Sequence, residues 1–208
     1  MNRIEEIYSY IDIKDKVVDV GCDQAKLSIM LSKRNQPSIA VDISEKVINN
    51  ARSKVDKSLV DLRVSNGLDK IKEGEADTLV LSGMGTHTII DILLNTNLRF
   101  KKIITISNNY HDILRERLNE LNYKIESEQI INENNKFYNL ILFKEGNDKL
   151  TEEDILLGKN HKDLNTYQEY LLYLLKKYQN IKKTSKDKNN KIDKMINLIN
   201  NKLKTINK

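Results

Sequence analysis

The stretch Val17-Val-Asp-Val-Gly-Cys-Asp-Gln-Ala25 decides the fold. Its apolar first half, Val17 to Val20, predicts a short buried strand, and Gly21 marks the turn that ends the strand. A helix pattern begins near Gln24, so the stretch predicts a strand–turn–helix unit. Backbone N–H groups at the start of such a helix can approach a ligand closely where glycine removes the side chain. A tight turn with a helix-capping Asp and no ligand is the alternative interpretation.

Alternating strand and helix patterns continue from this unit to about Gly146. The predicted strands span residues 17–20, 38–41, 60–64, 78–81, 103–106, 124–131 and 137–143, and the predicted helices span residues 26–34, 45–55, 87–94 and 112–121. Strands that alternate with helices imply parallel strands joined by right-handed crossovers. The last two strands are separated only by the polar residues 132–135, which predicts an antiparallel hairpin. We therefore expect an α/β, Rossmann-like sheet of the class I methyltransferase type, with five parallel strands and an antiparallel hairpin.

A purely helical region follows this alternating part of the chain. Apolar residues recur there at alternating steps of three and four, which predicts two helices with a coiled-coil-like seam. The seam residues are Leu164, Tyr167, Leu171, Leu174, Tyr178 and Ile181, followed by Ile192, Ile196, Ile199, Leu203 and Ile206. Because polar residues 184–190 separate the two runs, we expect an antiparallel helical hairpin. The chain is thus predicted to contain a domain of residues 1–148 and a helical hairpin of residues 149–208.

Positive charge is concentrated in the second of these parts. The 208-residue chain has a formal net charge of +5, and residues 151–208 contain 13 Lys against 7 Asp and Glu. One interpretation is a surface that binds phosphates, with additional stacking contacts from tyrosines. The candidate tyrosines are Tyr167, Tyr170, Tyr173 and Tyr178. The other interpretation is an ordinary solvated helix surface, in which Tyr167 and Tyr178 belong to the seam.

The remaining composition excludes several classes of protein. Cys22 is the only cysteine, which rules out a disulfide framework and a thiolate metal cluster. The N-terminus lacks a basic region followed by an apolar run, which is the pattern of a secretory signal. No apolar stretch approaches the roughly 18 residues needed to span a bilayer. We expect a cytoplasmic protein that binds neither a membrane nor a metal.

The motif Asp19-x-Gly21-x-Asp23 indicates the chemistry of the ligand. It is not the dinucleotide fingerprint G-x-G-x-x-G, because the second and third glycines are absent. A pyrophosphate needs these glycines, whereas S-adenosylmethionine carries no pyrophosphate. The carboxylates of Asp19 and Asp23 can accept hydrogen bonds from the ammonium group of such a ligand or balance its sulfonium charge.

Further candidate contacts follow the next strands at the same edge of the sheet. Asp42 ends the second strand, about twenty residues after Gly21, where a carboxylate can bind both ribose hydroxyls of a nucleoside. Asn66-Gly67 follows the third strand, and the Asn66 amide is a candidate for the edge of an adenine. Helix capping by Asp42 and a plain Asn-Gly turn are the alternative interpretations.

The segment Ser82-Gly-Met-Gly85 follows the fourth strand, at the position that faces the methyl acceptor in this architecture. It lacks the Asn/Asp-Pro-Pro-aromatic motif of enzymes that methylate exocyclic amines, and Cys22 lies in the wrong loop for carbon-5 pyrimidine methylation. A ring nitrogen with a free lone pair fits best, and positioning would then dominate the rate. Ser107-Asn-Asn109 ends the fifth strand at the same edge, as a ligand contact or as a helix cap.

Taken in order, these motifs resemble the TrmK family, bacterial tRNA methyltransferases that act on N1 of adenine at tRNA position 22. The resemblance runs nearly from end to end of the chain. The matching segments are Arg3-Ile4, Asp19-Val-Gly-Cys-Asp-Gln-Ala25, Asn66-Gly-Leu68, Gly74-Glu-Ala-Asp-Thr-Leu-Val-Leu-Ser-Gly-Met-Gly85, Lys136-Phe-Tyr-Asn-Leu-Ile141 and the helical hairpin. The chain departs from the family at Gln24 (His in the family), at Thr86 (Gly) and at residues 107–109 (Gln-Pro-Asn).

The resemblance implies a methyl donor, a substrate and a set of site residues. The residues expected to bind S-adenosylmethionine are Asp19, Gly21, Cys22, Asp42, Ile43, Asn66, Gly67, Gly83 and Met84. The target adenine is expected beside Asp23, Met84 and Asn108, with Asp23 either accepting from its exocyclic amine or serving only the donor. The helical hairpin is expected to contact tRNA, and the protein to act as a monomer. A small-molecule methyltransferase and a catalytically inactive RNA-binding protein are the alternative functions.

Overall fold

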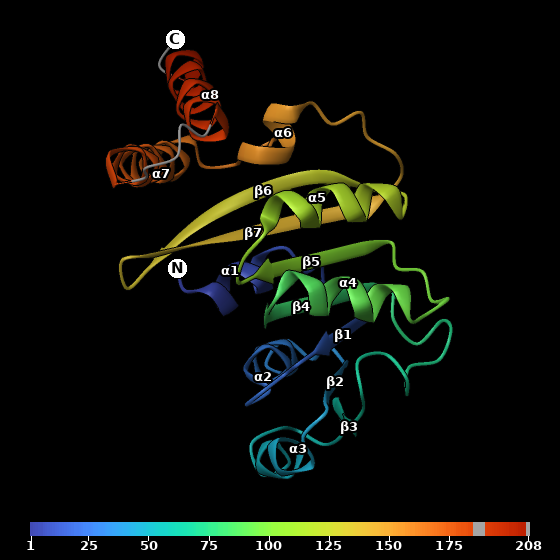
Figure 1. The fold of residues 1–208 in the computed structure, drawn as a ribbon. Coiled ribbons are helices and arrows are strands. Elements are labelled where there is room, and N and C mark those ends of the chain that lie inside the picture. The colour runs from blue at the N-terminus through green and yellow to red at the C-terminus, as the bar shows by residue number, and fades with distance from the viewer. Residues whose placement is uncertain (185–189, 207–208) are drawn as a thin grey trace.

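The computed structural model describes residues 1–184 and 190–206, which form a seven-stranded sheet with helices on both faces and a helical appendage at one edge (Figure 1). The strands are β1 (Val17–Val20), β2 (Ser38–Asp42), β3 (Val60–Val64), β4 (Thr78–Met84), β5 (Lys102–Ser107), β6 (Tyr123–Glu133) and β7 (Lys136–Glu145). The helices are α1 (Arg3–Ser9), α2 (Lys26–Ser32), α3 (Glu45–Ala51), α4 (Thr86–Leu94), α5 (His111–Glu120), α6 (Glu152–Leu157), α7 (Leu164–Thr184) and α8 (Asn190–Ile206). The sheet order is β3-β2-β1-β4-β5-β7-β6, parallel from β3 to β5 and antiparallel at β7 and β6. The predicted fold class is confirmed.

Burial of both faces explains why the parallel strands are almost continuously apolar. Successive side chains of a strand point to opposite faces, so neighbouring residues enter different cores. Leu79 and Ile103 pack in the core that includes residues of α4 and α5, whereas Val80 and Ile104 pack in the core that includes residues of α1 and α2. Strand β4 continues to Met84, past the apolar run that predicted its end at residue 81, because its last residues still pair with β5 across a bulge.

The β6–β7 hairpin is longer and its turn tighter than the sequence pattern predicted. Glu133 pairs with Lys136, so only Asn134 and Asn135 remain in the turn rather than residues 132–135. Both Asn residues have positive φ angles, 52° and 61°, as two-residue turns that match the twist of a hairpin require. Strands of 11 and 10 residues result, against 4 residues for β1.

The N-terminal helix α1 was not among the predicted helices. Asn2 and Glu5 form a reciprocal capping box at its start, in which each side chain accepts from the other's backbone N–H. Ile7 buries the inner face of this short helix against the sheet. The guanidinium of Arg3 donates to Glu133 at 2.7 Å and stacks 4.2 Å above the ring of Tyr138. These contacts fix the N-terminus of the chain beside the β6–β7 hairpin.

Helices α7 and α8 pack on each other beyond the hairpin (Figure 1). The middle of the predicted seam is buried, with Tyr167, Leu171 and Ile199 packed around Ile130 of β6. The helix ends depart from the prediction: Leu164 is 51% exposed and Ile181 is 38% exposed. Of the predicted polar connection, residues 185–189 lie outside the described part of the chain. Among residues 1–184 and 190–206, no helix is long and apolar enough to cross a membrane.

A buried ion pair ties α5 and the hairpin to the connection that leads into the appendage. Arg115 donates from two nitrogens to Glu128, at 3.0 and 2.7 Å, and from the third to the carbonyl of Ile155 at 2.8 Å. Both charged side chains are almost fully buried. Gly158 lies against them with a φ of +86°, and a Cβ there would stand 2.6 Å from a Glu128 oxygen. Only glycine therefore fits at this position.

Candidate active site

The loops that follow β1, β2 and β4 converge at the carboxyl edge of the sheet. Strands β1 and β4 are neighbours there. The chain adds β2 and β3 on one side of β1 and then adds β4 and β5 on the other side. Open α/β sheets bind ligands at the point where the strand order reverses in this way. A Cβ on Gly21 would lie 3.0 Å from the terminal methyl group of Met84, so the first and fourth loops are in contact. The backbone N–H of Asp23 reaches a carboxylate oxygen of Asp42 at 3.4 Å, which joins the first and second loops.

A cavity of about 590 Å³ opens beside these loops. It is lined by Asn2, Arg3, Ile4, Glu5, Ile7, Asp19, Gly21, Cys22, Asp23, Gln24, Lys26, Leu27, Ile29, Met30, Ser82, Gly83 and Glu133. The structure thus brings together five of the expected site residues, Asp19, Gly21, Cys22, Asp23 and Gly83. The lining does not include the expected residues Asp42, Ile43, Met84 and Asn108. It also adds Arg3, Glu5 and Glu133, which the sequence analysis did not assign to the site. The capping pattern Asn2-x-x-Glu5 is the signal that could have placed α1 there.

Glycine is required at both loops for conformational reasons. Gly21 and Gly83 have φ angles of +77° and +80°, a region that other residues rarely adopt. A Cβ on Gly83 would meet no atom within 4 Å, so the backbone is open on this side. Asp23 is a non-glycine residue in the same region, with φ of 47°, and is exposed. A ligand can therefore approach the main chain of Gly83 without meeting a side chain.

Asp19 is the most perturbed carboxyl group of the site. Asp19 lies in β1, near the carboxyl edge of the sheet, and only 7% of its surface is exposed. No described residue donates a hydrogen bond to its carboxylate. Burial, followed by the nearby negative charge of Asp42, raises its pKa from 3.8 to about 7. The same burial raises the pKa of the Cys22 thiol to about 12, so that thiol stays neutral. A cation beside Asp19 would favour the ionised carboxylate and so oppose both effects on its pKa.

Asp42 is held in place by backbone donors. One carboxylate oxygen accepts from the N–H of Ser44 at 2.9 Å, and the other faces Asp23. Ile43, between them in the chain, is 70% exposed and offers an apolar surface beside this carboxylate. Asn66 and Gly67 line a separate hollow of about 280 Å³ together with residues of α4. The structure therefore does not bring these two residues into the cavity with Asp19.

Asn108 supports the fourth loop from the neighbouring strand. Its side-chain amide donates to the carbonyl of Gly83 at 3.0 Å, and its backbone N–H donates to the carbonyl of Met84 at 3.0 Å. Thr86, one of the departures from the family pattern, is buried, and its hydroxyl donates to the carbonyl of Asn109. Both contacts fasten the Gly83 loop to the end of β5.

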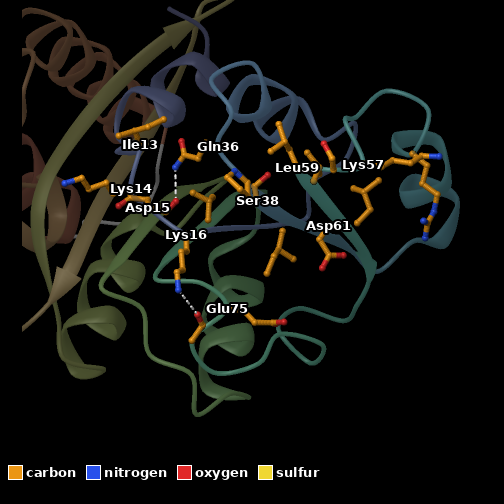
Figure 2. Close-up of a pocket in the computed structure, with 18 residues that line it drawn as sticks. Ile13, Lys14, Asp15, Lys16, Gln36, Ser38, Lys57, Leu59, Asp61 and Glu75 are labelled. Atoms are coloured by element: carbon orange, nitrogen blue, oxygen red, sulfur yellow. Dashed lines mark hydrogen bonds between the residues drawn. The ribbon is translucent and has the colours of Figure 1, made fainter.

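Another cavity lies at the opposite edge of the sheet. It measures about 770 Å³ and is lined by strand starts such as Val17, Ser38 and Val60. Figure 2 shows Gln36 donating to the carbonyl of Asp15, at 2.8 Å, across its wall. Ligands of open α/β sheets bind at the carboxyl ends of the strands, so we do not assign the active site to this cavity. Among the described residues, no group of three or more His, Cys, Asp or Glu side chains could hold a metal ion.

Comparison with known proteins gives close matches over almost the whole chain. The tRNA (adenine(22)-N(1))-methyltransferase of Bacillus subtilis is 28% identical over 165 residues, which cover 75% of this chain and 69% of that protein. A crystal structure from Streptococcus pneumoniae, proposed to be a tRNA (m1A22) methyltransferase, has a TM-score of 0.88 and 25% identity, covering 98% of this chain and 99% of that one. The TrmK structure of M. capricolum in complex with S-adenosylhomocysteine has a TM-score of 0.86 and 28% identity, covering 99% and 98%.

These relatives confirm the resemblance that the sequence motifs indicated. Residues 1–141 also match a family model described as a methyltransferase domain. That segment contains β1 to β6 and both loops that line the cavity. By this match, the chain belongs to the methyltransferase domain family.

Proposed function

We propose that this protein transfers a methyl group from S-adenosylmethionine to N1 of adenine 22 in tRNA. The observation that carries the proposal is the acidic, glycine-lined cavity at the loops of Asp19 and Gly83, with Asp42 in contact with the first of these loops. The relatives support the reaction, because the curated one is named for this activity and the M. capricolum structure contains S-adenosylhomocysteine, the demethylated donor.

The residues of the cavity fit the donor chemically. S-adenosylmethionine supplies a methyl group activated by a sulfonium charge, and it carries a free ammonium group and two ribose hydroxyls. Asp19 is a buried carboxylate without a donor from the described residues, and an ammonium group would satisfy it. Asp42 stands at the end of β2, where it can accept from ribose hydroxyls. Gly83 leaves the main chain open for close approach.

Asp23 is the residue that we assign to the target base. Its carboxylate is exposed at the mouth of the cavity, while its backbone N–H is held by Asp42. There it can accept from the exocyclic amine of the adenine and stabilise the positive charge that forms on the ring. N1 carries its own lone pair, so the protein needs to position the base rather than remove a proton. Flipping the base out of its stack costs a few kcal/mol.

Met84 and Asn108 would act on the geometry of the transfer. The Met84 side chain packs on Gly21 and so sets the distance between the first and fourth loops. Asn108 holds the Gly83 carbonyl, so it orients the loop that faces the methyl acceptor. We assign both a positioning role.

The basic appendage is proposed to contact the tRNA. Residues 149–208 carry the surplus of lysines, and a positively charged helical hairpin can bind the phosphates of an RNA. We further propose that residues 1–148 form the catalytic domain, that the protein acts as a monomer, and that it works in the cytoplasm, where its substrate occurs.

Two matched glycine variants test the donor site. Gly83→Ala and Gly74→Ala impose the same backbone strain, with φ of +80° and +78°, and neither new Cβ would meet a protein atom within 4 Å. Both should lose similar stability, about 1 kcal/mol. Only Gly83→Ala should weaken S-adenosylhomocysteine binding measured by calorimetry, by about tenfold or more, because its methyl group enters the space proposed for the donor. Equal affinities of the two variants would contradict the assignment.

Asp23→Asn tests the role at the target base. We expect the turnover number on unmodified tRNA to fall by about 100-fold, because the charge that stabilises the methylated ring is lost. The affinity for S-adenosylhomocysteine should stay unchanged. Mass spectrometry of the tRNA nucleosides identifies the product as 1-methyladenosine. Unchanged turnover would remove Asp23 from the reaction, and a product other than 1-methyladenosine would refute the proposed acceptor.

A further inference from the structure

Another hollow, of about 740 Å³, lies between the end of β5, the tip of the β6–β7 hairpin and helix α7. We call it the aromatic groove. It is lined by Ser107, Asn108, Asn109, Tyr110, His111, Asp112, Arg115, Asn135, Lys136, Phe137, Tyr138, Asn139, Leu156, Tyr170, Tyr173, Leu174, Lys177, Tyr178 and Met195. None of the donor-site residues Asp19, Gly21 and Gly83 is among them, so this is a different site.

The aromatic rings of the groove are clustered but incompletely packed. Phe137 stands 5.5 Å from the ring of Tyr170 and 5.3 Å from that of Tyr173, and both pairs are tilted. Tyr173 is 50% exposed, so a face of its ring is free. Tyr167, on the same helix, differs: it is buried and stacked on His161 at 3.5 Å. The Tyr173 ring is therefore available to a flat ligand, whereas the Tyr167 ring belongs to the core.

The charge on the groove rim is predominantly positive. Lys136 of the hairpin and Lys177 of α7 are both exposed, and neither forms an ion pair with a residue of the described chain. Asp112 is the one acidic residue in the lining, and the Arg115 charge is already neutralised by Glu128. Two free ammonium groups beside an exposed aromatic ring are the usual components of a site for single-stranded nucleic acid.

The aromatic groove adjoins the proposed methyl-transfer site. Asn108 lines the groove and donates to the carbonyl of Gly83, which lines the donor cavity. On the other side of the hairpin, Arg3 lines the donor cavity and stacks on Tyr138, which lines the groove. In each of these two contacts, a residue that lines the groove touches a residue that lines the donor cavity. One RNA chain can therefore reach both the mouth of the donor cavity and the groove.

We propose that the aromatic groove binds an unpaired nucleotide that neighbours the target adenine in the RNA, with its base on Tyr173 and its phosphate near Lys177. The proposal rests on the proposed function and names a subsite for its substrate. Its consequence is that the enzyme binds two consecutive nucleotides, the target and its neighbour. Binding of the neighbouring nucleotide in the groove would hold the RNA strand in place while the adenine is flipped.

Affinity for unmodified tRNA, measured by fluorescence anisotropy, tests the subsite with matched variants. Tyr173→Ala should weaken binding by about tenfold, because one stacked base is lost, while Tyr173→Phe should bind like the wild type. Leu172→Ala is the control, since Leu172 is equally exposed, 50%, on the same helix and does not line the groove. Lys177→Gln should weaken binding more than Lys176→Gln, which removes the same charge from a lysine that does not line the groove. Melting temperatures show whether the variants are folded.

A fluorescent base gives a readout that a structural role would not change. With 2-aminopurine beside the target adenine, wild-type protein should quench the fluorescence by stacking, and Tyr173→Ala should not. If the wild-type protein methylates tRNA but Tyr173→Ala binds tRNA as tightly as Leu172→Ala does, the proposed subsite is wrong. The proposed function would stand in that case. Wild-type protein that neither binds nor methylates tRNA overturns both proposals. A groove that instead mediates self-association, seen as a dimer that Tyr173→Ala dissociates with unchanged RNA affinity, also overturns the subsite.

Discussion

Asp19 should make donor binding depend on pH near neutrality. Its carboxyl has a pKa of about 7 in the folded protein, against 3.8 in a solvated chain, and it must be ionised to pair with an ammonium group. About one tenth of the molecules are ionised at this residue at pH 6, and about nine tenths at pH 8. Because the apparent dissociation constant scales inversely with the competent fraction, the affinity should be about tenfold weaker at pH 6 than at pH 8.

Calorimetric titration with S-adenosylhomocysteine measures this effect. Repeating the titration in buffers of different ionisation enthalpy gives the number of protons released, which we expect to be close to one at pH 6 and close to zero at pH 8. Asp19→Asn is the control, since it keeps the shape of the side chain and removes the titrating group. Any pH dependence that the variant retains belongs to the ligand. An affinity difference between wild type and variant that stays constant from pH 6 to pH 8 would refute the role of Asp19.

Two stability predictions concern the junction of the sheet and the appendage. Glu128→Gln should lower the free energy of unfolding by about 3 kcal/mol, because the Arg115 charge stays buried without its counter-ion. Urea unfolding measures this free energy, and a loss below about 1 kcal/mol would contradict the buried pair. Gly158→Ala should cost about 2 to 4 kcal/mol, from backbone strain and the 2.6 Å approach to Glu128, and should lower the melting temperature far more than Gly74→Ala, which has a similar φ but open space.

The sheet could be predicted from the sequence because strands that are buried on both faces consist mainly of apolar residues. The apolar run at Val17–Val20 coincides with β1, and the alternating apolar and charged residues of Val60–Val64 coincide with the edge strand β3. The end of β4 could not be found in this way, since Ser82 and Gly83 are polar or small, and the strand continues only because Ser82 and Met84 pair with β5 on either side of a bulge. The convergence of the loops followed from strand order, because carboxyl ends of parallel strands share one edge.

Side-chain pairings between distant segments could not be predicted from the sequence. Arg115 and Glu128 are charged residues, a type that usually faces solvent, and only their mutual contact makes burial tolerable. Arg3 shows the other kind of gap. Its helix carried a readable signal in the capping pattern of Asn2 and Glu5, but the partner Glu133 lies 130 residues away.

The β6–β7 hairpin connects the two proposed binding sites, and its length has a functional explanation. A strand of 4 residues suffices to reach the active edge in β1, whereas β6 has 11 and continues past that edge. The extension brings Glu133 to the wall of the donor cavity, and Lys136 and Phe137, just past the turn, to the aromatic groove. Because Arg3 is bound to Glu133 and stacked on Tyr138, the N-terminus stiffens the hairpin at this point. A rigid tip between two hollows can hold adjacent nucleotides apart, which is what extraction of one base from a stack requires.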